Sequence, residues 1–132
     1  MNTTVINLLD ALRTHLSDFE LPAPYSAHLT TYSGGAQVGL QLATHHLPEI
    51  ARGLLAWADT LTETTTEAWR VPQGDSLHLT VTGQLSEGIQ IQVYGSLPFT
   101  QHGITADLAP GDSKTVPWAV LRERAAPGEV LL

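Results

Sequence analysis

The stretch SLHLTVTGQLSEGIQIQVYG, residues 76–95, constrains the fold more than any other, because apolar and polar residues alternate on both sides of a glycine-containing loop. This period of two is typical of β-strands that bury one face. The side chains expected to point toward a core are Leu77, Leu79, Val81, Ile89, Ile91 and Val93. Those expected on the opposite face are His78, Thr80, Thr82, Gln90, Gln92 and Tyr94. The stretch therefore predicts two antiparallel strands with one polar face that carries no formal charge.

Two other segments have the period of an amphipathic helix. Over residues 4–19, apolar side chains recur every three or four positions, and Pro22 and Pro24 prevent the helix from continuing. A second apolar stripe begins at Pro48, which suits a first helical position, and runs to about Leu61 or Glu63. Each stripe needs an apolar surface, and the apolar face of a sheet supplies one.

The remaining strands follow from turn signals. Residues 25–44 alternate again and contain Gly34-Gly35, which predicts a hairpin. Residues 64–71 are rich in β-branched and aromatic side chains, which predicts a strand leading into a meander over 65–71, 76–82 and 89–95. In that strand Trp69 is expected to face the core and Arg70 the opposite side.

These elements predict a single α+β domain over residues 1–132, a length that can bury one core. The expected architecture is a largely antiparallel sheet of about five strands with two amphipathic helices on one face, in the order α-ββ-α-βββ. An irregular C-terminal tail follows, with a short helix or strand near 116–124. The order resembles that of small acidic chaperones that bind secreted proteins, but those usually place three strands before the second helix, where this chain places two. Likeness of fold alone says little about function.

Composition excludes several classes of function. Thirteen acidic and six scattered basic residues give a formal net charge of −7, which would repel a nucleic-acid backbone. No run approaches the ~20 apolar residues that a membrane span requires, so neither nucleic acid nor membrane is an expected partner. The chain contains no cysteine, which fits a reducing cytoplasm. We therefore expect a cytoplasmic protein.

The uncharged sheet face is the main candidate for a functional surface. Its predicted interface residues are His28, Thr30, Tyr32, Gln41, His78, Thr80, Thr82, Gln90, Gln92 and Tyr94. Gln37 is expected beside them, with Arg70 as the one charged member of the face. Interface cores are depleted of charge and enriched in Tyr, so the partner would be a second copy of the chain or another protein. Two alternatives to an interface stay open. The face could be an ordinary solvated one, because exposed strands tolerate the same residues, or the C-terminal tail could cover it.

Histidines suggest two further hypotheses. His45, His46 and Glu49 have a spacing compatible with metal ligands, but adjacent histidines diverge, so a loop or capping role is favoured. His28 and His78 would form a pH-sensitive pair if their strands were neighbours.

The sequence contains no nucleophile elbow and no phosphate-binding loop, and we expect no cofactor and no metal. The predicted function is a non-catalytic protein-interaction module acting by self-association or by adaptor or chaperone-like binding. The alternative is a small-ligand or enzyme site between the sheet end and the tail, lined by Tyr94, His102 or Asp107.

Overall fold

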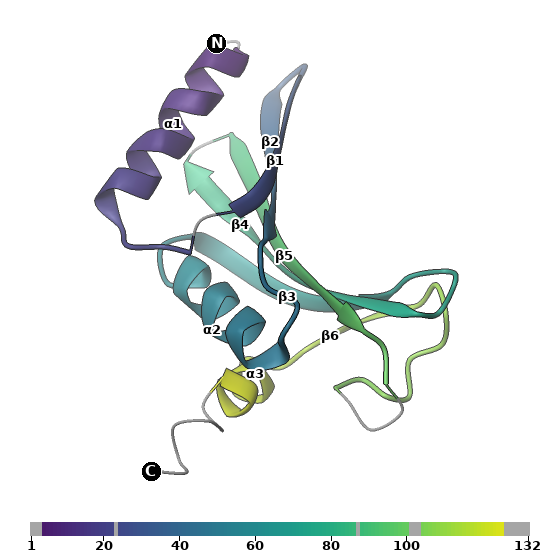
Figure 1. Ribbon diagram of the computed structural model, residues 1–132. Helices are drawn as coiled ribbons and strands as arrows, with labels where there is room; N and C mark the ends of the chain where they lie inside the picture. The colour runs from purple at the N-terminus through teal and green to yellow at the C-terminus, as the bar shows by residue number, and fades with distance from the viewer. Residues whose placement is uncertain (1–3, 23, 87, 101–103, 126–132) are drawn as a thin grey trace.

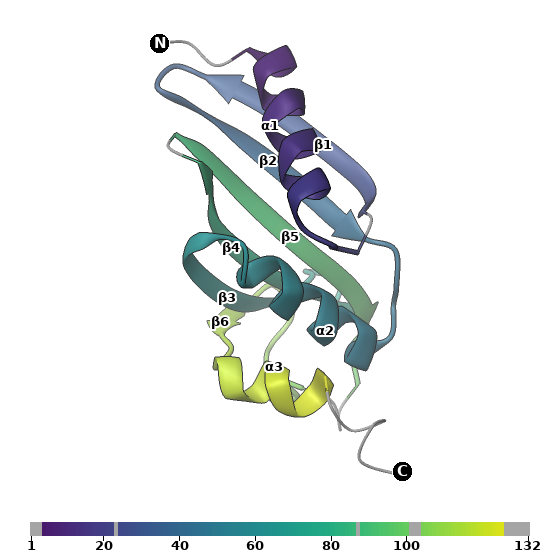
Figure 2. The same ribbon diagram turned by 90° about the vertical axis from the view of Figure 1, so that its left-hand side faces the viewer.

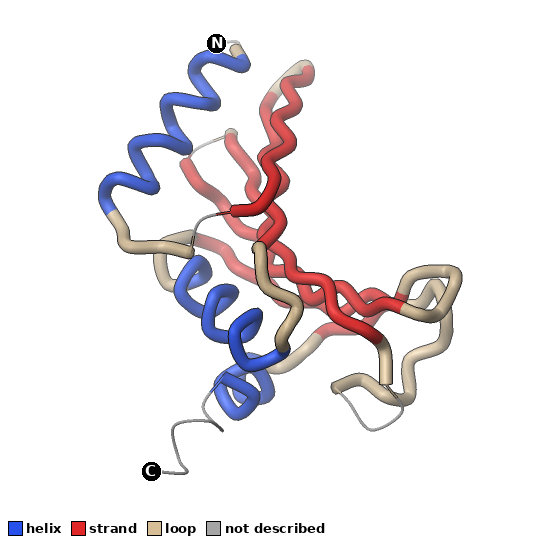
Figure 3. The backbone as a smooth tube through the Cα atoms, in the orientation of Figure 1, coloured by secondary structure: helices blue, strands red, loops and turns tan. Residues whose placement is uncertain are grey.

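The computed structural model describes residues 4–22, 24–86, 88–100 and 104–125, and these form an α+β fold (Figure 1). The helices are α1 (Val5–Asp18), α2 (Leu47–Ala58) and α3 (Trp118–Ala125). The strands are β1 (Pro24–Tyr32), β2 (Gly35–Leu42), β3 (Thr62–Arg70), β4 (Ser76–Ser86), β5 (Ile89–Pro98) and β6 (Ser113–Thr115). They form one six-stranded sheet in the order β1-β2-β5-β4-β3-β6, drawn in red in Figure 3. The predicted α+β class is confirmed.

The sheet is mixed, which the turn signals did not predict. β2 and β5 run parallel, with Val38 opposite Ile91, whereas the other neighbouring pairs are antiparallel. The β1–β2 hairpin and the β3–β4–β5 meander each form through local turns. Helix α2 lies between them in the chain, and β5, the last meander strand, pairs with β2. Local patterns determine each unit but not the direction in which the units meet.

All three helices lie on the same side of the sheet (Figures 1 and 2). Helix α1 is capped by Thr4, whose Oγ1 accepts a hydrogen bond from the Asn7 N–H at 3.1 Å. Helix α2 ends at Ala58, earlier than the predicted 61–63. The chain turns after Ala58, and the Thr60 hydroxyl donates to the Trp57 carbonyl at 2.8 Å in this turn. Strand β3 then begins at Thr62.

The core lies between the helices and the alternating apolar residues of the sheet. The six apolar side chains predicted to be buried are buried: Leu77, Leu79, Val81, Ile89, Ile91 and Val93. Helix α2 approaches the sheet most closely at Gly95, where a Cβ atom would lie 2.6 Å from Ile50 Cγ2. A glycine is therefore needed at this position of β5 for the helix to pack at this depth.

The C-terminal tail is more regular than predicted. It adds β6 to the β3 edge of the sheet, and α3 is the short helix expected near 116–124. Arg52 of α2 donates from Nη1 to the Ala125 carbonyl at 2.9 Å, which ties α3 to α2. The described tail residues before β6 lie beside the β3–β4 turn, where the Gly111 N–H donates to the Arg70 carbonyl (Figure 1). The rest of the described tail forms β6 at the β3 edge and α3 beside α2 (Figure 2). No helix in the described part of the chain is long and apolar enough to cross a membrane.

Candidate functional site

The face of the sheet that carries no helix is here named the open face. It is formed by the residues of β1–β5 whose side chains alternate with the buried ones. Its fifteen larger central residues are His28, Thr30, Tyr32, Gln37, Gln41, Thr65, Glu67, Trp69, His78, Thr80, Thr82, Gln84, Gln90, Gln92 and Tyr94. All ten predicted interface residues lie on this face, and their role in binding stays a prediction.

The parallel pairing of β2 with β5 joins the polar sides of the hairpin and the meander into one surface. Gln37 lies opposite Gln90, and Gln41 lies opposite Tyr94. The Tyr94 hydroxyl donates to Gln41 Oε1 at 3.2 Å across this junction. The open face is therefore continuous from β1 to β3.

An aromatic cluster occupies one end of the open face. The His78 ring stacks on the Tyr94 ring with centroids 5.0 Å apart, and the Trp69 ring meets His78 edge-on at 5.2 Å. Burial between these rings lowers the pKa of His78, so its neutral form is favoured. A shallow hollow of about 420 Å³ lies here, and its lining residues are Thr65, Glu67, Trp69, His78, Thr80, Thr82, Gln92 and Tyr94.

The prediction that Trp69 faces the core and Arg70 the open side is wrong. Ala68 is fully buried, so its neighbour Trp69 points to the open face, where it is 36% exposed. The cause is the cross-strand register, in which Trp69 pairs with His78 and Arg70 pairs with the inward-facing Leu77. Counting back across the Pro72–Asp75 turn from Leu77 would have given this register from the sequence. The size of the indole suggested burial instead.

Arg70 binds the C-terminal segment rather than lying on the open face. Its Nε donates to the Gly74 carbonyl at 2.9 Å, and its Nη1 donates to the Leu108 carbonyl at 2.8 Å. The guanidinium carbon lies 3.6 Å from the centroid of the Phe99 ring, a cation–π contact. Glu67, which pairs with Thr80, is consequently the one formally charged residue among the fifteen open-face residues named above.

The proposed pairing of His28 with His78 does not occur. His28 lies on β1 and His78 on β4, and strands β2 and β5 lie between them. Three strand spacings place the two backbones about 14 Å apart. The hypothesis of a titrating pair on this face is therefore wrong.

His45, His46 and Glu49 have separate structural roles. The His45 Nδ1–H donates to the Ser96 carbonyl at 3.0 Å, and Glu49 Oε1 accepts from the Thr44 hydroxyl at 2.9 Å. His46 is the N-cap residue of α2, without a side-chain capping bond. Within the described residues, no three His, Cys, Asp or Glu side chains are placed to hold a metal ion.

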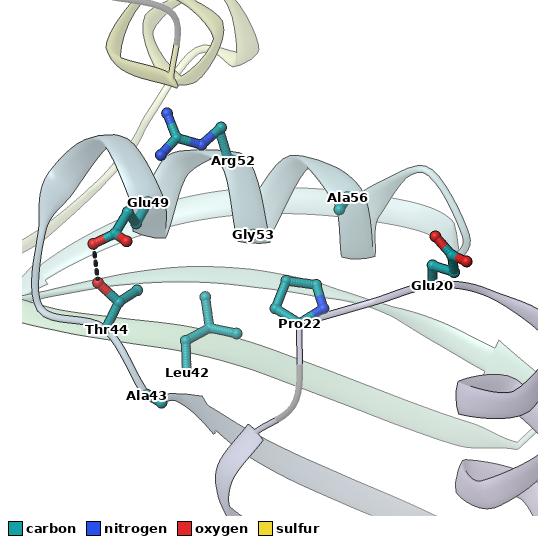
Figure 4. A pocket seen from close by; sticks show the side chains of 9 residues that line it. All are labelled: Glu20, Pro22, Leu42, Ala43, Thr44, Glu49, Arg52, Gly53 and Ala56. Atoms are coloured by element: carbon teal, nitrogen blue, oxygen red, sulfur yellow. Dashed lines mark hydrogen bonds between the residues drawn. The ribbon is translucent and has the colours of Figure 1, made fainter. Parts of the chain in front are cut away.

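A second hollow, of about 540 Å³, lies between α2, the end of β2 and the segment that follows α1 (Figure 4). Leu42, Pro22 and Gly53 form its apolar part, while Glu20 and Glu49 lie at opposite ends. Arg52, on its rim, is bound to the Ala125 carbonyl. The two carboxylates are too far apart to share a proton or a reacting group, so the hollow offers space without converging chemistry.

The alternative site at the sheet end combined Tyr94, Asp107 and His102. Tyr94 lies on the open face, whereas Asp107 is exposed in the tail and accepts from Lys114 Nζ at 3.1 Å. That bond is the largest cause of the lowered pKa of Asp107. His102 lies outside the described residues. Tyr94 and Asp107 do not share the hollow on the open face.

The chain was compared with protein-family models, with curated proteins and with solved structures, and no match was found in any of the three.

Proposed function

We propose that this protein is a non-catalytic cytoplasmic protein-interaction module that acts through its open face. Its partner is a second copy of the chain, or another protein bound in an adaptor or chaperone-like manner. The observation that carries the proposal is the charge distribution. Among the fifteen residues that define the open face only Glu67 is charged, in a chain whose formal net charge is −7.

The composition of the open face suits a contact that excludes water. Burying an unpaired charge is costly, whereas Thr, Gln and Tyr side chains can exchange hydrogen bonds with water for hydrogen bonds with a partner. Trp69 and Tyr94 add two of the side chains that most often anchor protein interfaces. The neutral form of His78, favoured by its burial, keeps the aromatic cluster uncharged near pH 7.

The open face is large enough for a weak but specific contact. Five strands at about 4.8 Å spacing and eight residues at about 3.3 Å rise cover roughly 600 Å². A pair of such faces would bury about 1,200 Å², which is at the lower end of specific protein interfaces. The hollow on the open face is lined by residues of β3, β4 and β5 alone. The described tail residues lie instead at the β3–β4 turn, at the β3 edge and beside α2.

The test adds two positive charges to the centre of the open face with Thr80→Lys and Gln92→Lys. If the face is a contact between copies, two unpaired like charges per chain are buried there, which is strongly unfavourable. Sedimentation should show an assembly that loses this contact while circular dichroism shows a retained fold. The matched control is Thr14→Lys with Ser17→Lys, two exposed positions of α1 that add the same charge.

Two outcomes would contradict self-association through the open face. One is a wild-type protein that sediments at the chain mass at high concentration. The other is a Thr80→Lys, Gln92→Lys variant that associates as tightly as the Thr14→Lys, Ser17→Lys control. On a solvated surface these substitutions should change the free energy of unfolding by only about 0.5 kcal/mol.

The second candidate is a small-ligand-binding domain, and the hollow of Figure 4 supports it. Its volume of about 540 Å³ is within the range of ligand sites. Native mass spectrometry of the protein purified from cells that express it would detect a retained small molecule as mass above that of the chain. A spectrum with the bare chain alone would count against this candidate.

A further inference from the structure

We propose that the protein forms a homodimer by antiparallel pairing of β1 with β1 of a second copy, so that the two sheets join edge to edge. This contact uses the backbone of an edge strand and one flank of α1. It is separate from the open face and does not depend on the function proposed above.

The two edges of the sheet differ in a way that favours pairing at β1. At one edge, β6 has three residues, and one of them is Lys114. Short strands and lysines prevent edge-to-edge association in natural sheets. At the other edge, β1 has nine residues and none of them is Asp, Glu, Lys or Arg. Its one irregularity lies at its start, between Pro24 and Ser26, which leaves the stretch from Ser26 to Tyr32 open to a partner.

The hairpin register identifies which backbone groups of β1 are free. Tyr32 and Gly35 pair across a two-residue turn, and such a pair exchanges both of its backbone hydrogen bonds. Because hydrogen-bonded and non-bonded pairs alternate, Ala27, Leu29 and Thr31 direct their N–H and C=O groups away from β2. These groups have the spacing that a second antiparallel strand requires.

An apolar flank of α1 continues this edge on the helix side. Val5 and Leu9 are 45% and 47% exposed. On the helix they lie on the flank opposite Thr14 and Asp18, which line a hollow together with Leu85 of β4. Val5 and Leu9 therefore face the β1 side of the sheet, where α1 contacts β1.

A second copy is the occupant that fits this edge. A two-fold contact brings a surface against itself, so any charge on it would meet a like charge. Residues 21–48 contain no Asp, Glu, Lys or Arg, although the whole chain is acidic. The stretch from Ser26 to Tyr32, about 23 Å long, with a flank about 20 Å deep gives about 460 Å² per copy, or about 900 Å² in total. This is the size of a weak dimer, which forms at high protein concentration.

The dimer would also enlarge the open face. Edge-to-edge pairing keeps both sheets continuous, so the two open faces adjoin along β1. His28, Thr30 and Tyr32 of both copies then lie at the centre of one joined surface. Each of these residues is exposed in the single chain.

The test places lysines on the β1 edge with Ala27→Lys and Thr31→Lys, both at exposed positions. The matched control places them on the opposite edge with Ser113→Lys and Thr115→Lys, which are also exposed. We expect the wild type and the control to sediment as dimers. In the Ala27→Lys, Thr31→Lys variant, repulsion between the copies should raise the dissociation constant at least about tenfold.

Hydrogen exchange shows whether the contact is strand pairing. In the wild-type dimer the amides of Ala27, Leu29 and Thr31 should exchange more slowly than in the Ala27→Lys, Thr31→Lys variant. The His28 amide, which points toward β2, should be protected in both. A wild type that is monomeric at all concentrations overturns the proposal, and so does a β1 variant that associates as tightly as the β6 control.

The outcome also separates this contact from the open-face contact. If β1 pairing is the one contact, Ala27→Lys with Thr31→Lys yields monomers and Thr80→Lys with Gln92→Lys leaves dimers. If the open face is the one contact, Thr80→Lys with Gln92→Lys yields monomers and Ala27→Lys with Thr31→Lys leaves dimers. The edge proposal is then wrong. If both contacts form, the wild type is larger than a dimer and each variant removes one contact.

Discussion

The covered face and the open face of the sheet are formed by the same strands, and both carry little charge, but for different reasons. On the covered face, Leu77, Leu79 and Val81 are at most 1% exposed beneath the helices, where charge is excluded by burial. On the open face, the alternating residues His78, Thr80 and Thr82 are half-buried by their strand neighbours and remain in contact with solvent. Folding requires the first pattern but does not require the second. We propose that the low charge of the open face relates to what the face contacts.

The sheet edges show the same contrast on a smaller scale. Lys114 of β6 and the three-residue length of that strand protect one edge, whereas β1 is long and uncharged. Charged residues are available in this chain, and most of them lie on the helices, turns and tail, with Glu63, Glu67 and Arg70 on β3. Their absence from β1 and from most of the open face is therefore a property of these surfaces rather than of the composition.

The largest expected effect is on the covered face. Leu79→Ala would remove a fully buried side chain beneath the helices and leave a cavity. We expect it to lower the free energy of unfolding by about 2–5 kcal/mol. The adjacent open-face substitution Thr80→Ala should cost only about 0.5 kcal/mol. Chemical denaturation of both variants measures the difference, and equal losses would mean that the two faces do not differ in packing.

Two glycines provide a finer comparison of the faces. A methyl group at Gly95 would lie 2.6 Å from Ile50 Cγ2, whereas one at Gly39 would meet only His28 Cβ, at 3.7 Å. Gly95→Ala must displace α2 and should cost about 1–3 kcal/mol. Gly39→Ala has room on the open face and should change stability by no more than about 0.5 kcal/mol. A destabilised Gly39→Ala protein would indicate that the open face is covered in solution.

The sequence predicted the side chains of each face better than the way in which the strands assemble. Alternation over residues 76–95 assigned twelve side chains to the correct faces, because a strand with one buried face permits only one register. The α+β class followed from the two helical stripes, which need an apolar sheet face to cover. These inferences rest on local periodicity, which a single sequence contains.

What could not be predicted depends on contacts between distant segments. The parallel pairing of β2 with β5 joins residues more than fifty positions apart, and no local signal sets its direction. The addition of β6 to β3 is of the same kind. The aromatic cluster differs, because the local β3–β4 register that pairs Trp69 with His78 was available from the sequence, and the size of the indole ring led to the wrong face.

The smallest expected effect concerns two histidines, one on each side of the sheet. His15 lies on α1 between Phe19 and Trp57, and its Nε2–H donates to the Thr60 hydroxyl at 2.7 Å. Burial lowers the pKa of His15, against a smaller opposing effect of Asp18, and burial also lowers the pKa of His78. Below about pH 6.5 the unfolded chain therefore binds protons that the folded chain does not.

The free energy of unfolding should consequently fall as the pH is lowered from about 7.5 to about 5.5, because the unfolded state gains protons first. His15→Gln and His78→Gln should each reduce this slope, since glutamine does not titrate. Urea denaturation at several pH values measures it. If His78→Gln leaves the slope unchanged while His15→Gln reduces it, the imidazole of His78 is solvated like that of an ordinary exposed strand residue. The aromatic cluster would then be loose, and the open face would lose its best-packed anchor for a partner.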